Sequence, residues 1–281
     1  MWSLELAIFL DVGIWILDVL AVPRPRIIFI TGTDTGVGKT LLTSLLLAHL
    51  RARGIRPLAL KPFCSGSRSD ALLLHSLMED ELTLDEINPF YFPEPIAPLI
   101  AARKHHRRIS LRHVLSHISR ITHPPSVGSA KEGRASRIVS ACSHAPTLPP
   151  STLLIEGAGG LLSPLAEDCT ALDVICSLGC EVLVVAPNKL GTINHTLLTI
   201  RTLRQSATRA TDSPRPTRIV LMNCPSPDLS AASNPRILSE LLAPIQVSTL
   251  PFLGRNCRTS EAIRTHSKVL NQKLSRLLKR P

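Results

Sequence analysis

The chain has 281 residues, and its 32 Lys and Arg against 21 Asp and Glu give a formal net charge of +11. A hydrophobic content of 44% is ordinary for a globular protein, which excludes collagen-like and wholly disordered chains. Aromatic residues, at 3%, are too few for a platform that stacks single-stranded nucleic acid, whereas the charge leaves phosphorylated ligands open. Seven cysteines without a CxxC pair predict reduced thiols and a cytoplasmic protein.

The first 25 residues contain an apolar stretch, 6–22, which Asp11 and Asp18 interrupt. No Lys or Arg precedes it, unlike in a secretory signal, and a membrane-spanning helix would have to bury both carboxylates. We therefore expect residues 1–25 to be an apolar extension outside the working fold. An added packed helix is the first alternative, and a membrane anchor is the least favoured. Residues 26–281 are predicted to form a single domain.

From residue 26 onward, short and uniformly apolar runs alternate with helix-like stretches, which indicates buried parallel strands joined by crossover helices. The predicted strands are 26–31, 57–61, 152–156, 181–187, 218–223 and 247–251. The predicted helices are 39–53, 69–78, 193–206 and 235–242, with Asn234 as the cap of the last and Pro235 in its first turn. This pattern predicts an α/β fold with a doubly wound, mostly parallel sheet, helices on both faces, and ligands beyond the carboxyl ends of the strands. Because the segment GVGKT at 36–40 stands between the first strand and the first helix, the predicted sheet is of the P-loop NTPase type.

A different composition marks residues 122–150, which are rich in Pro, Ser, Ala and Gly and hold a single acid. Such a segment can bury little, so a flexible insertion is predicted. Nine Lys or Arg lie between residues 103 and 137 and eight from residue 255 onward, with one acid in each segment. The positive charge therefore belongs to peripheral segments, and we expect no nucleic acid at the active site.

The strongest local signal is the segment TGTDTGVGKT at 31–40, between the first strand and a leucine-rich helix. Gly36 and Gly38 allow backbone N–H groups to turn toward phosphate oxygens, and the helix start adds its positive end. Lys39 would reach the outer phosphates, and the Thr40 hydroxyl would bind Mg²⁺. The predicted nucleotide-binding residues here are Asp34, Thr35, Gly36, Val37, Gly38, Lys39, Thr40 and Leu41.

Two acids complete a candidate metal site. Glu156 ends an apolar strand, which is where a P-loop protein places a metal-facing carboxylate. Asp70 begins the helix after the second strand, where helix capping is the alternative role. Because Mg²⁺ needs only one or two carboxylates beside phosphate oxygens and water, Thr40, Asp70 and Glu156 suffice, and phosphoryl transfer follows as the reaction class.

Four further segments narrow the reaction. They are KPFCSGS at 61–67, NPFYF at 88–92 with Glu94 and Pro95, EGAGG at 156–160 with Pro164 and Leu165, and KLGTINH at 189–195. Together with the phosphate loop, and in this order from about residue 26 to residue 252, they resemble the dethiobiotin synthetase family.

That resemblance implies an ATP- and Mg²⁺-dependent cyclo-ligase of biotin biosynthesis, which makes dethiobiotin from 7,8-diaminononanoate and CO₂. The implied steps are formation of a carbamate on one amine, transfer of the γ-phosphoryl group to it, and attack by the second amine with loss of phosphate. Lys61 would bridge carbamate and γ-phosphate as the main catalytic residue, assisted by Lys39 on the phosphates. Ser65 would hold the substrate amine or carbamate.

The resemblance also implies binding roles and an assembly. Gly191, Thr192, Ile193 and Asn194 would hold the substrate carboxylate across an interface, which implies a homodimer. The implied nucleotide contacts include Gly157, Ala158 and Gly159, which follow Glu156. Asn223 would recognise the adenine base, and the base pocket would be lined by Leu250, Pro251 and Phe252.

Three positions depart from the family pattern. Gly36 stands where the family often has an acidic residue, which leaves nucleotide selectivity open. The loop between Lys61 and Asp70 is short, so the placement of Asp70 is less defined than that of Glu156. Leu99 follows Pro98 where a histidine is expected. None of the three removes a group that the chemistry requires.

The alternative from another class is a partition-type switch ATPase of the same superfamily, which dimerises on ATP and binds DNA. The net charge favours it. However, Gly32 and Thr33 stand where such proteins usually carry an extra lysine, and such proteins lack the segment at 61–67. A cobyrinate-type amide synthetase would need a glutamine-cleaving domain for which the chain has no room. A non-catalytic binder is disfavoured by the intact lysines and acids.

Overall fold

A computed structural model describes residues 25–123, 150–207, 216–254 and 256–279. Nearly all of the predicted N-terminal extension and of the predicted insertion therefore lie outside the described residues. The expected start of the insertion is wrong, because Thr122 is still helical and only 3% exposed. Its hydroxyl donates to the carbonyl of Ile118 over 3.1 Å, so the buried helix face continues to this residue.

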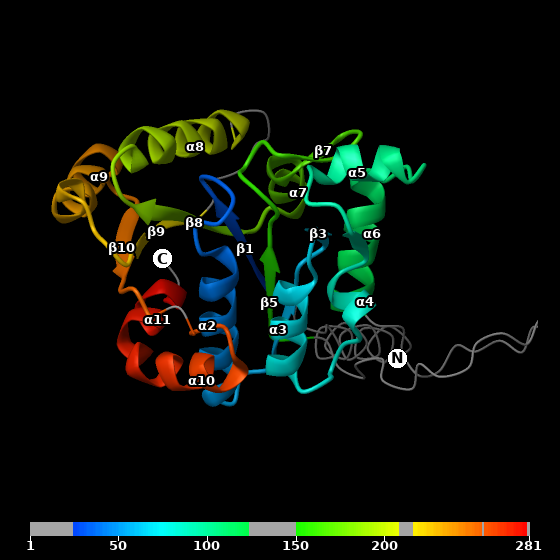
Figure 1. The fold of residues 1–281 in the computed structure, drawn as a ribbon, viewed down its shortest axis with the longest axis horizontal. Helices are drawn as coiled ribbons and strands as arrows, with labels where there is room; N and C mark the ends of the chain where they lie inside the picture. Colours follow the sequence, from blue (N-terminus) through cyan, green and yellow to red (C-terminus); the bar gives the residue numbers. More distant parts are fainter. Residues whose placement is uncertain (1–24, 124–149, 208–215, 255, 280–281) are drawn as a thin grey trace, which may run out of the picture.

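The centre of the molecule is a six-stranded sheet in the order β10-β9-β8-β1-β5-β2, and every neighbouring pair is parallel. The strands are β1 (Arg26–Gly32), β2 (Pro57–Leu60), β5 (Thr152–Glu156), β8 (Glu181–Asn188), β9 (Thr217–Asn223) and β10 (Gln246–Leu250). This arrangement confirms the predicted parallel α/β sheet. The chain places β5 between β1 and β2, which precede it in the sequence (Figure 1).

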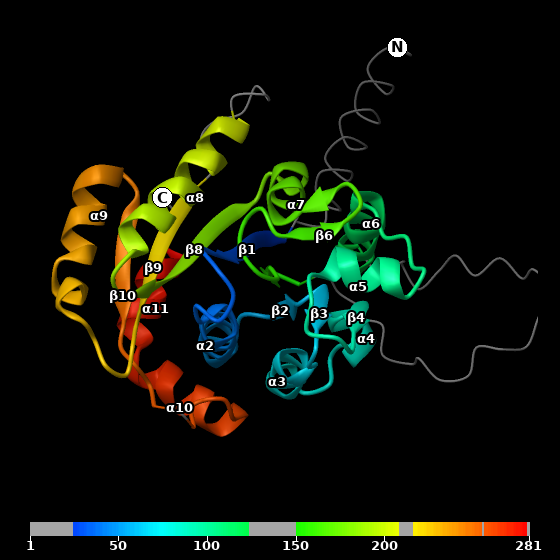
Figure 2. The ribbon, with the colours of Figure 1, turned by 45° about the horizontal axis from the view of Figure 1, so that its top comes forward.

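Helices cover both faces of the sheet, as predicted. The four expected helices are α2 (Lys39–Ala52), α3 (Ser69–Met78), α8 (Thr192–Ala207) and α9 (Asn234–Leu242). Figure 2 shows α2 and α3 on one side of the sheet and α8 on the other, together with α7 (Ala171–Leu178). At the C-terminal end, α10 (Ser260–Val269) and α11 (Asn271–Leu278) pack against α2.

The helices α7, α10 and α11 were not predicted, and neither were the remaining elements. The remaining elements are β3 (Phe63–Ser65), α4 (Leu84–Ile87), β4 (Phe90–Phe92), α5 (Pro98–Lys104), α6 (Leu111–Thr122), β6 (Pro164–Ala166), β7 (Cys169–Thr170) and the 3-10 helix η1 (Leu229–Ala232). β3 and β4 form a separate parallel pair in which the rings of Phe63 and Phe90 stack at 4.8 Å. No helix within the described ranges is long and apolar enough to span a bilayer.

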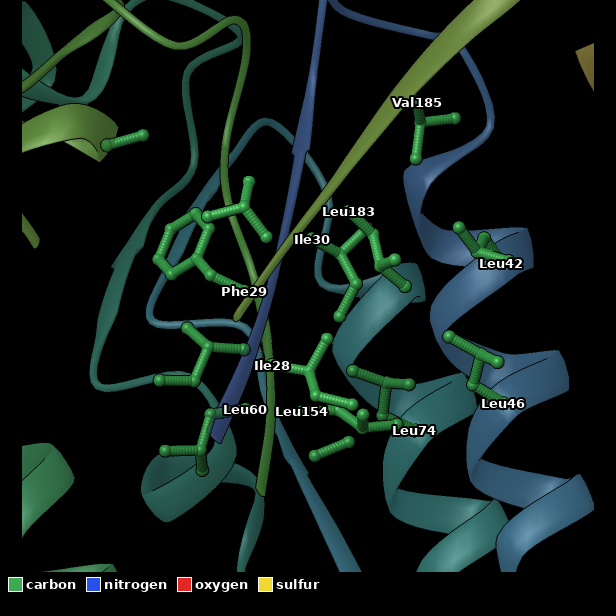
Figure 3. Packing of buried hydrophobic residues seen from close by; sticks show 14 of the residues in the cluster. Ile28, Phe29, Ile30, Leu42, Leu46, Leu60, Leu74, Leu154, Leu183 and Val185 are labelled. Atoms are coloured by element: carbon green, nitrogen blue, oxygen red, sulfur yellow. The ribbon is translucent and has the colours of Figure 1, made fainter. Parts of the chain in front are cut away.

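The core explains why β1 reads as an unbroken apolar run. Ile28 and Ile30 point toward α2, whereas Phe29 points to the opposite face (Figure 3). All three are at most 2% exposed, and Leu42 and Leu46 of α2, on the side of Ile28 and Ile30, are fully buried. Because both faces of a parallel sheet are covered, its strands lose the alternation of polar and apolar residues.

Three predicted boundaries need correction. Lys61 lies just after β2, since its N–H donates to the carbonyl of Ile87 and not to β5. Pro251 lies after β10, and it has no N–H with which to continue the ladder. Asn234 is not the cap of α9: it is a buried residue within the helix, and its amide donates to Asn188 Oδ1 over 3.1 Å.

Ion pairs at the amino ends of three parallel strands connect these strands to the last helix of the described chain. Arg26 Nε lies 2.6 Å from Glu181 Oε1, and Arg218 Nη1 lies 3.3 Å from Glu181 Oε2. Arg26 also donates to the carbonyl of Leu278 at the end of α11. These side chains are at most 15% exposed, so the network is a largely buried connection between β1, β8, β9 and α11.

Candidate active site

The phosphate loop lies at the carboxyl end of β1, as predicted. Gly36 and Gly38 have φ angles of 74° and 103°, a backbone region that side chains disfavour. A Cβ at Gly38 would also lie 3.1 Å from Cγ of Met222 in β9. The local sequence therefore allows the tight loop that turns β1 directly into α2.

Lys39 lies folded over this loop. Its Nζ donates to the carbonyl of Asp34 over 2.7 Å, and the residue is only 6% exposed. Burial lowers the pKa of Lys39 to about 8, an effect that the Glu156 carboxylate partly opposes and the Lys61 ammonium reinforces. An anion bound in the loop would stabilise the charged form of this lysine.

The candidate metal ligands meet at one point although they come from distant parts of the chain. The Thr40 hydroxyl donates to Glu156 Oε1 over 2.6 Å. The ammonium of Lys61 donates to the same oxygen and lies 3.0 Å from Asp70 Oδ2. The structure thus brings together Lys61, which follows β2, Glu156 at the end of β5, and the first turns of α2 and α3.

Charge within this cluster is balanced internally. Burial opposes the charge on Lys61, but Glu156 and Asp70 outweigh it and raise the pKa of the lysine. Burial likewise opposes ionisation of Asp70, but the charge of Lys61 and hydrogen bonds from Lys61 and Thr40 hold its pKa below the usual range. Asp70 therefore faces the cluster as a carboxylate, and the N-cap of α3 is Arg68.

The cluster suits a hard divalent cation. Thr40, Asp70 and Glu156 offer only oxygen donors, which Mg²⁺ prefers. Glu156 Oε2 is buried and has no hydrogen-bond partner within the described part of the chain. A buried carboxylate oxygen without a partner is costly, and a bound cation would satisfy it.

A cavity of about 470 Å³ opens beside the cluster. Its walls contain the predicted site residues Thr35, Gly36, Gly38, Lys39, Thr40, Lys61, Ser65, Asp70, Glu156, Ala158 and Gly159. Ser65 lines the cavity, and its hydroxyl oxygen is buried without a partner in the described part of the chain. Burial raises the pKa of the neighbouring Cys64 thiol to about 12, which keeps it protonated and unreactive.

Sequence reasoning missed part of the cavity wall. The segment 95–98 lines it, and the sequence signals there were the Glu94-Pro95 pair and Pro98. Arg258, which precedes α10, reaches the cavity with its guanidinium 3.8 Å from Asp70 Oδ1. No motif marked this arginine, because it lies in a basic segment that resembles ordinary solvated surface.

Several predicted binding residues do not line this cavity. They are Asp34, Val37, Leu41, Gly157, Gly191, Thr192, Ile193, Asn194, Asn223, Leu250, Pro251 and Phe252. Leu250 is fully buried and Phe252 is 44% exposed. Asn223 accepts a hydrogen bond from Asn188 over 2.9 Å at the end of β9, next to the strand residue Met222 that contacts the phosphate loop. The roles of these residues stay predictions.

Comparison with known proteins agrees with the geometry. The sequence model of a family described as "AAA domain" matches residues 26–255. The ATP-dependent dethiobiotin synthetase BioD of Anaeromyxobacter sp. (strain K) is 35% identical over 246 residues, which cover 85% of this chain and 96% of that protein. The enzyme of the same name from Anaeromyxobacter sp. (strain Fw109-5) is 38% identical over 183 residues, or 64% of this chain and 71% of that protein.

Among solved structures, the MinC:MinD cell division protein complex of Aquifex aeolicus aligns with a TM-score of 0.53 at 12% identity. The alignment covers 91% of this chain and 97% of the matched chain, and at this identity it shows a shared fold alone. Sequence identity across most of the chain, together with an intact phosphate loop, carries the assignment further. The chain belongs to the AAA domain family of P-loop proteins and, within it, to the ATP-dependent dethiobiotin synthetases.

Proposed function

We propose that this chain closes the ureido ring of dethiobiotin from 7,8-diaminononanoate, CO₂ and ATP. The observation that carries the proposal is the position of Lys61, whose ammonium lies between two carboxylates on the wall of the cavity shared with the phosphate loop. The reaction brings a carbamate and a triphosphate together, so the barrier is mainly electrostatic. Positively charged groups that are already in position lower such a barrier, because they offset the repulsion between the two anions.

The chemistry follows in three steps. One amine of the substrate forms a C–N bond to CO₂ and loses a proton, which gives a carbamate. A carbamate oxygen then attacks the γ-phosphorus, the bond to the bridging oxygen breaks, and ADP leaves. The second amine attacks the carbamate carbon and loses a proton, the C–O bond to the phosphoryl group breaks, phosphate leaves, and the ring closes. Lys39 would hold the triphosphate, Lys61 would neutralise the carbamate and the transferred group, and the Ser65 hydroxyl would bind the reacting amine or carbamate.

Thr40, Asp70 and Glu156 would hold Mg²⁺, which supplies charge neutralisation on the outer phosphate oxygens. The residues prepare the site in advance, because Lys61 keeps Asp70 ionised. A site that is already charged and oriented needs little rearrangement when the substrates bind.

Substrate recognition is proposed at the start of α8. Its N-terminal N–H groups, in the segment 191–194, suit a carboxylate. The resemblance assigns this carboxylate to an interface between two copies, and Leu190 before the segment and Leu198 on α8 are 80% and 56% exposed. A homodimer would cover both leucines. Asn223, with the segment 250–252, is proposed to bind the adenine, and the cytoplasmic location stays a prediction.

The proposal is tested by incubating the protein with 7,8-diaminononanoate, bicarbonate, Mg²⁺ and ATP, with detection of dethiobiotin by mass spectrometry. We expect one ADP and one phosphate per dethiobiotin, and no dethiobiotin when diaminononanoate or bicarbonate is omitted. Absence of dethiobiotin in the complete mixture, with ATP hydrolysis that DNA stimulates, would overturn the ligase and favour the switch ATPase.

A further inference from the structure

We propose that Asn88 is a positioning residue that fixes the backbone of Lys61 and thereby aims its ammonium into the active site. The inference rests on the proposed function, in which Lys61 meets the carbamate and the γ-phosphoryl group. Asn88 belongs to the segment 88–92, to which no role in the chemistry has been given above. Its side chain does not line the cavity, so it would act through Lys61.

Lys61 needs such support because the sheet does not provide it. The ladder between β2 and β5 ends where Leu60 pairs with Ile155. Beyond this pair, the N–H of Lys61 donates to the carbonyl of Ile87 over 3.0 Å. Pro62 follows and has no N–H to contribute. The catalytic lysine therefore stands on a short segment outside the sheet, at the point where the chain turns toward β3.

The amide of Asn88 bridges that segment. Its Nδ2 donates to the carbonyl of Lys61 over 2.8 Å and to the carbonyl of Pro62 over 3.3 Å. Its Oδ1 accepts from Arg68 Nε over 3.1 Å. Asn88 is 1% exposed, so water does not compete for these bonds. Every polar atom of the side chain is thus committed to a fixed geometry.

The residue type follows from that geometry. The site requires donors toward two carbonyls and one acceptor toward a guanidinium, and a carboxamide supplies both. A carboxylate of the same shape would keep the acceptor for Arg68 but would face the two carbonyls with lone pairs. An alanine would leave both carbonyls and the guanidinium nitrogen without this partner in a buried place.

Asn88 is itself held by the short helix before it. Its N–H donates to the carbonyl of Leu84, and α4 begins with a capping box in which the Thr83 hydroxyl accepts from the N–H of Glu86 over 3.2 Å. Thr83 is remote from Lys61 in this chain of contacts. Its removal weakens the same helix without touching the bonds to the lysine backbone, which makes it the matched control.

The experiment measures turnover, KM for ATP and binding of a non-hydrolysable ATP analogue in Asn88→Ala, Asn88→Asp and Thr83→Ala. Because a small displacement of a catalytic group costs up to ~10²-fold in rate, we expect Asn88→Ala and Asn88→Asp to lower kcat by at least ~10-fold. Analogue binding, which also counts folded sites, is expected to stay within about 2-fold. Thr83→Ala is expected to keep kcat within about 2-fold while its unfolding midpoint falls.

A double-mutant cycle separates positioning from a general structural role. When Lys61→Ala is already present, adding Asn88→Ala should lower kcat by less than a further factor of about 2. The reason is that Asn88 acts through the Lys61 ammonium, which that background lacks. An equal loss in both backgrounds would overturn the inference, as would near-normal kcat in Asn88→Ala. A fall in kcat in Asn88→Asp but not in Asn88→Ala would show that the added charge is the cause, and it would also overturn the inference. If the unmodified protein makes no dethiobiotin, the proposed function itself fails, which is a separate outcome.

Discussion

The hydroxyl of Thr40 donates to Glu156 Oε1 over 2.6 Å, although 116 residues separate the two in the sequence. Thr40 ends the phosphate loop and lies in the first turn of α2, and Glu156 ends β5, the strand beside β1. The bond therefore connects the phosphate loop to the proposed metal site. It also places a motif at residue 40 and an acid at residue 156 at one point, as the proposed metal site requires.

Glu156→Gln tests that connection. The substitution keeps the shape of the side chain but removes the negative charge, so the affinity for Mg²⁺ should fall. We expect kcat to drop by at least ~10²-fold and the Mg²⁺ concentration for half-maximal rate to rise ~10-fold or more. Titration of Mg²⁺ at saturating ATP measures both. Glu240→Gln, which removes an exposed charge paired with Arg236, is the control and should change neither.

Lys61→Ala tests the catalytic assignment. Lys61 would act on the carbamate and the transferred group, whereas Lys39 and the loop hold the nucleotide. We therefore expect kcat to fall by at least ~10²-fold while nucleotide affinity changes by less than about 3-fold. Lys273→Ala removes an exposed lysine that donates to the carbonyl of Thr249 and serves as the control. Near-normal turnover in Lys61→Ala would show that the role belongs to another residue.

Gly159→Ala and Gly179→Ala form a matched pair. Both glycines have positive φ angles, 68° and 58°, but a Cβ at Gly159 would lie 2.3 Å from Ser163 Oγ, whereas at Gly179 it would meet nothing within 4 Å. Gly179→Ala should cost only the backbone strain of about 1 kcal/mol. Gly159→Ala should cost more and also lower turnover, because its loop lines the cavity. Urea unfolding and kcat measured side by side decide this, and equal effects of the two would contradict it.

Glu181→Gln tests how an ion pair away from the active site makes the free energy of unfolding depend on pH. Burial opposes ionisation of Glu181, but Arg26 and then Arg218 outweigh it and hold its pKa below the usual value of 4.5. The carboxylate therefore stabilises the fold fully above pH 4.5, and this contribution is lost as the pH falls through the folded-state pKa. We expect the variant to be ~2 kcal/mol less stable at pH 7, with the difference shrinking toward pH 3. A difference independent of pH would contradict the role of the ion pairs.

Leu198→Asp tests the proposed dimer. Leu198 lies on α8, whose first turn belongs to the proposed carboxylate segment, and a charge there would oppose burial against a second copy. We expect a dimer for the unmodified protein in sedimentation velocity and a monomer for the variant. Leu72→Asp changes a leucine of similar exposure, 52% against 56%, on α3, and it should remain a dimer. A monomeric unmodified protein would rule out the proposed interface.

The sheet could be predicted from the sequence because buried parallel strands are uniformly apolar, and the phosphate loop because its chemistry is local. Other features depend on contacts between distant segments. β3 and β4 are too short for a pattern, and their pairing depends on Phe63 meeting Phe90. Arg258 reaches the cavity only because α10 packs on α2. Asn88 lies in the segment NPFYF, but the acceptor of its hydrogen bond is a backbone carbonyl, which no sequence pattern reveals.

The position of β5 between β1 and β2 has a consequence for how the protein matures. β1 and β2 are synthesised first, yet they do not pair with each other, and the strand that separates them follows β2 by more than 90 residues. Such long-range pairing is slow, because the entropy cost of closing the loop comes before the favourable contacts form. Glu156 arrives with that strand. A nascent chain that has made the phosphate loop therefore lacks the carboxylate opposite Thr40, and tight nucleotide binding should report that β5 is in place.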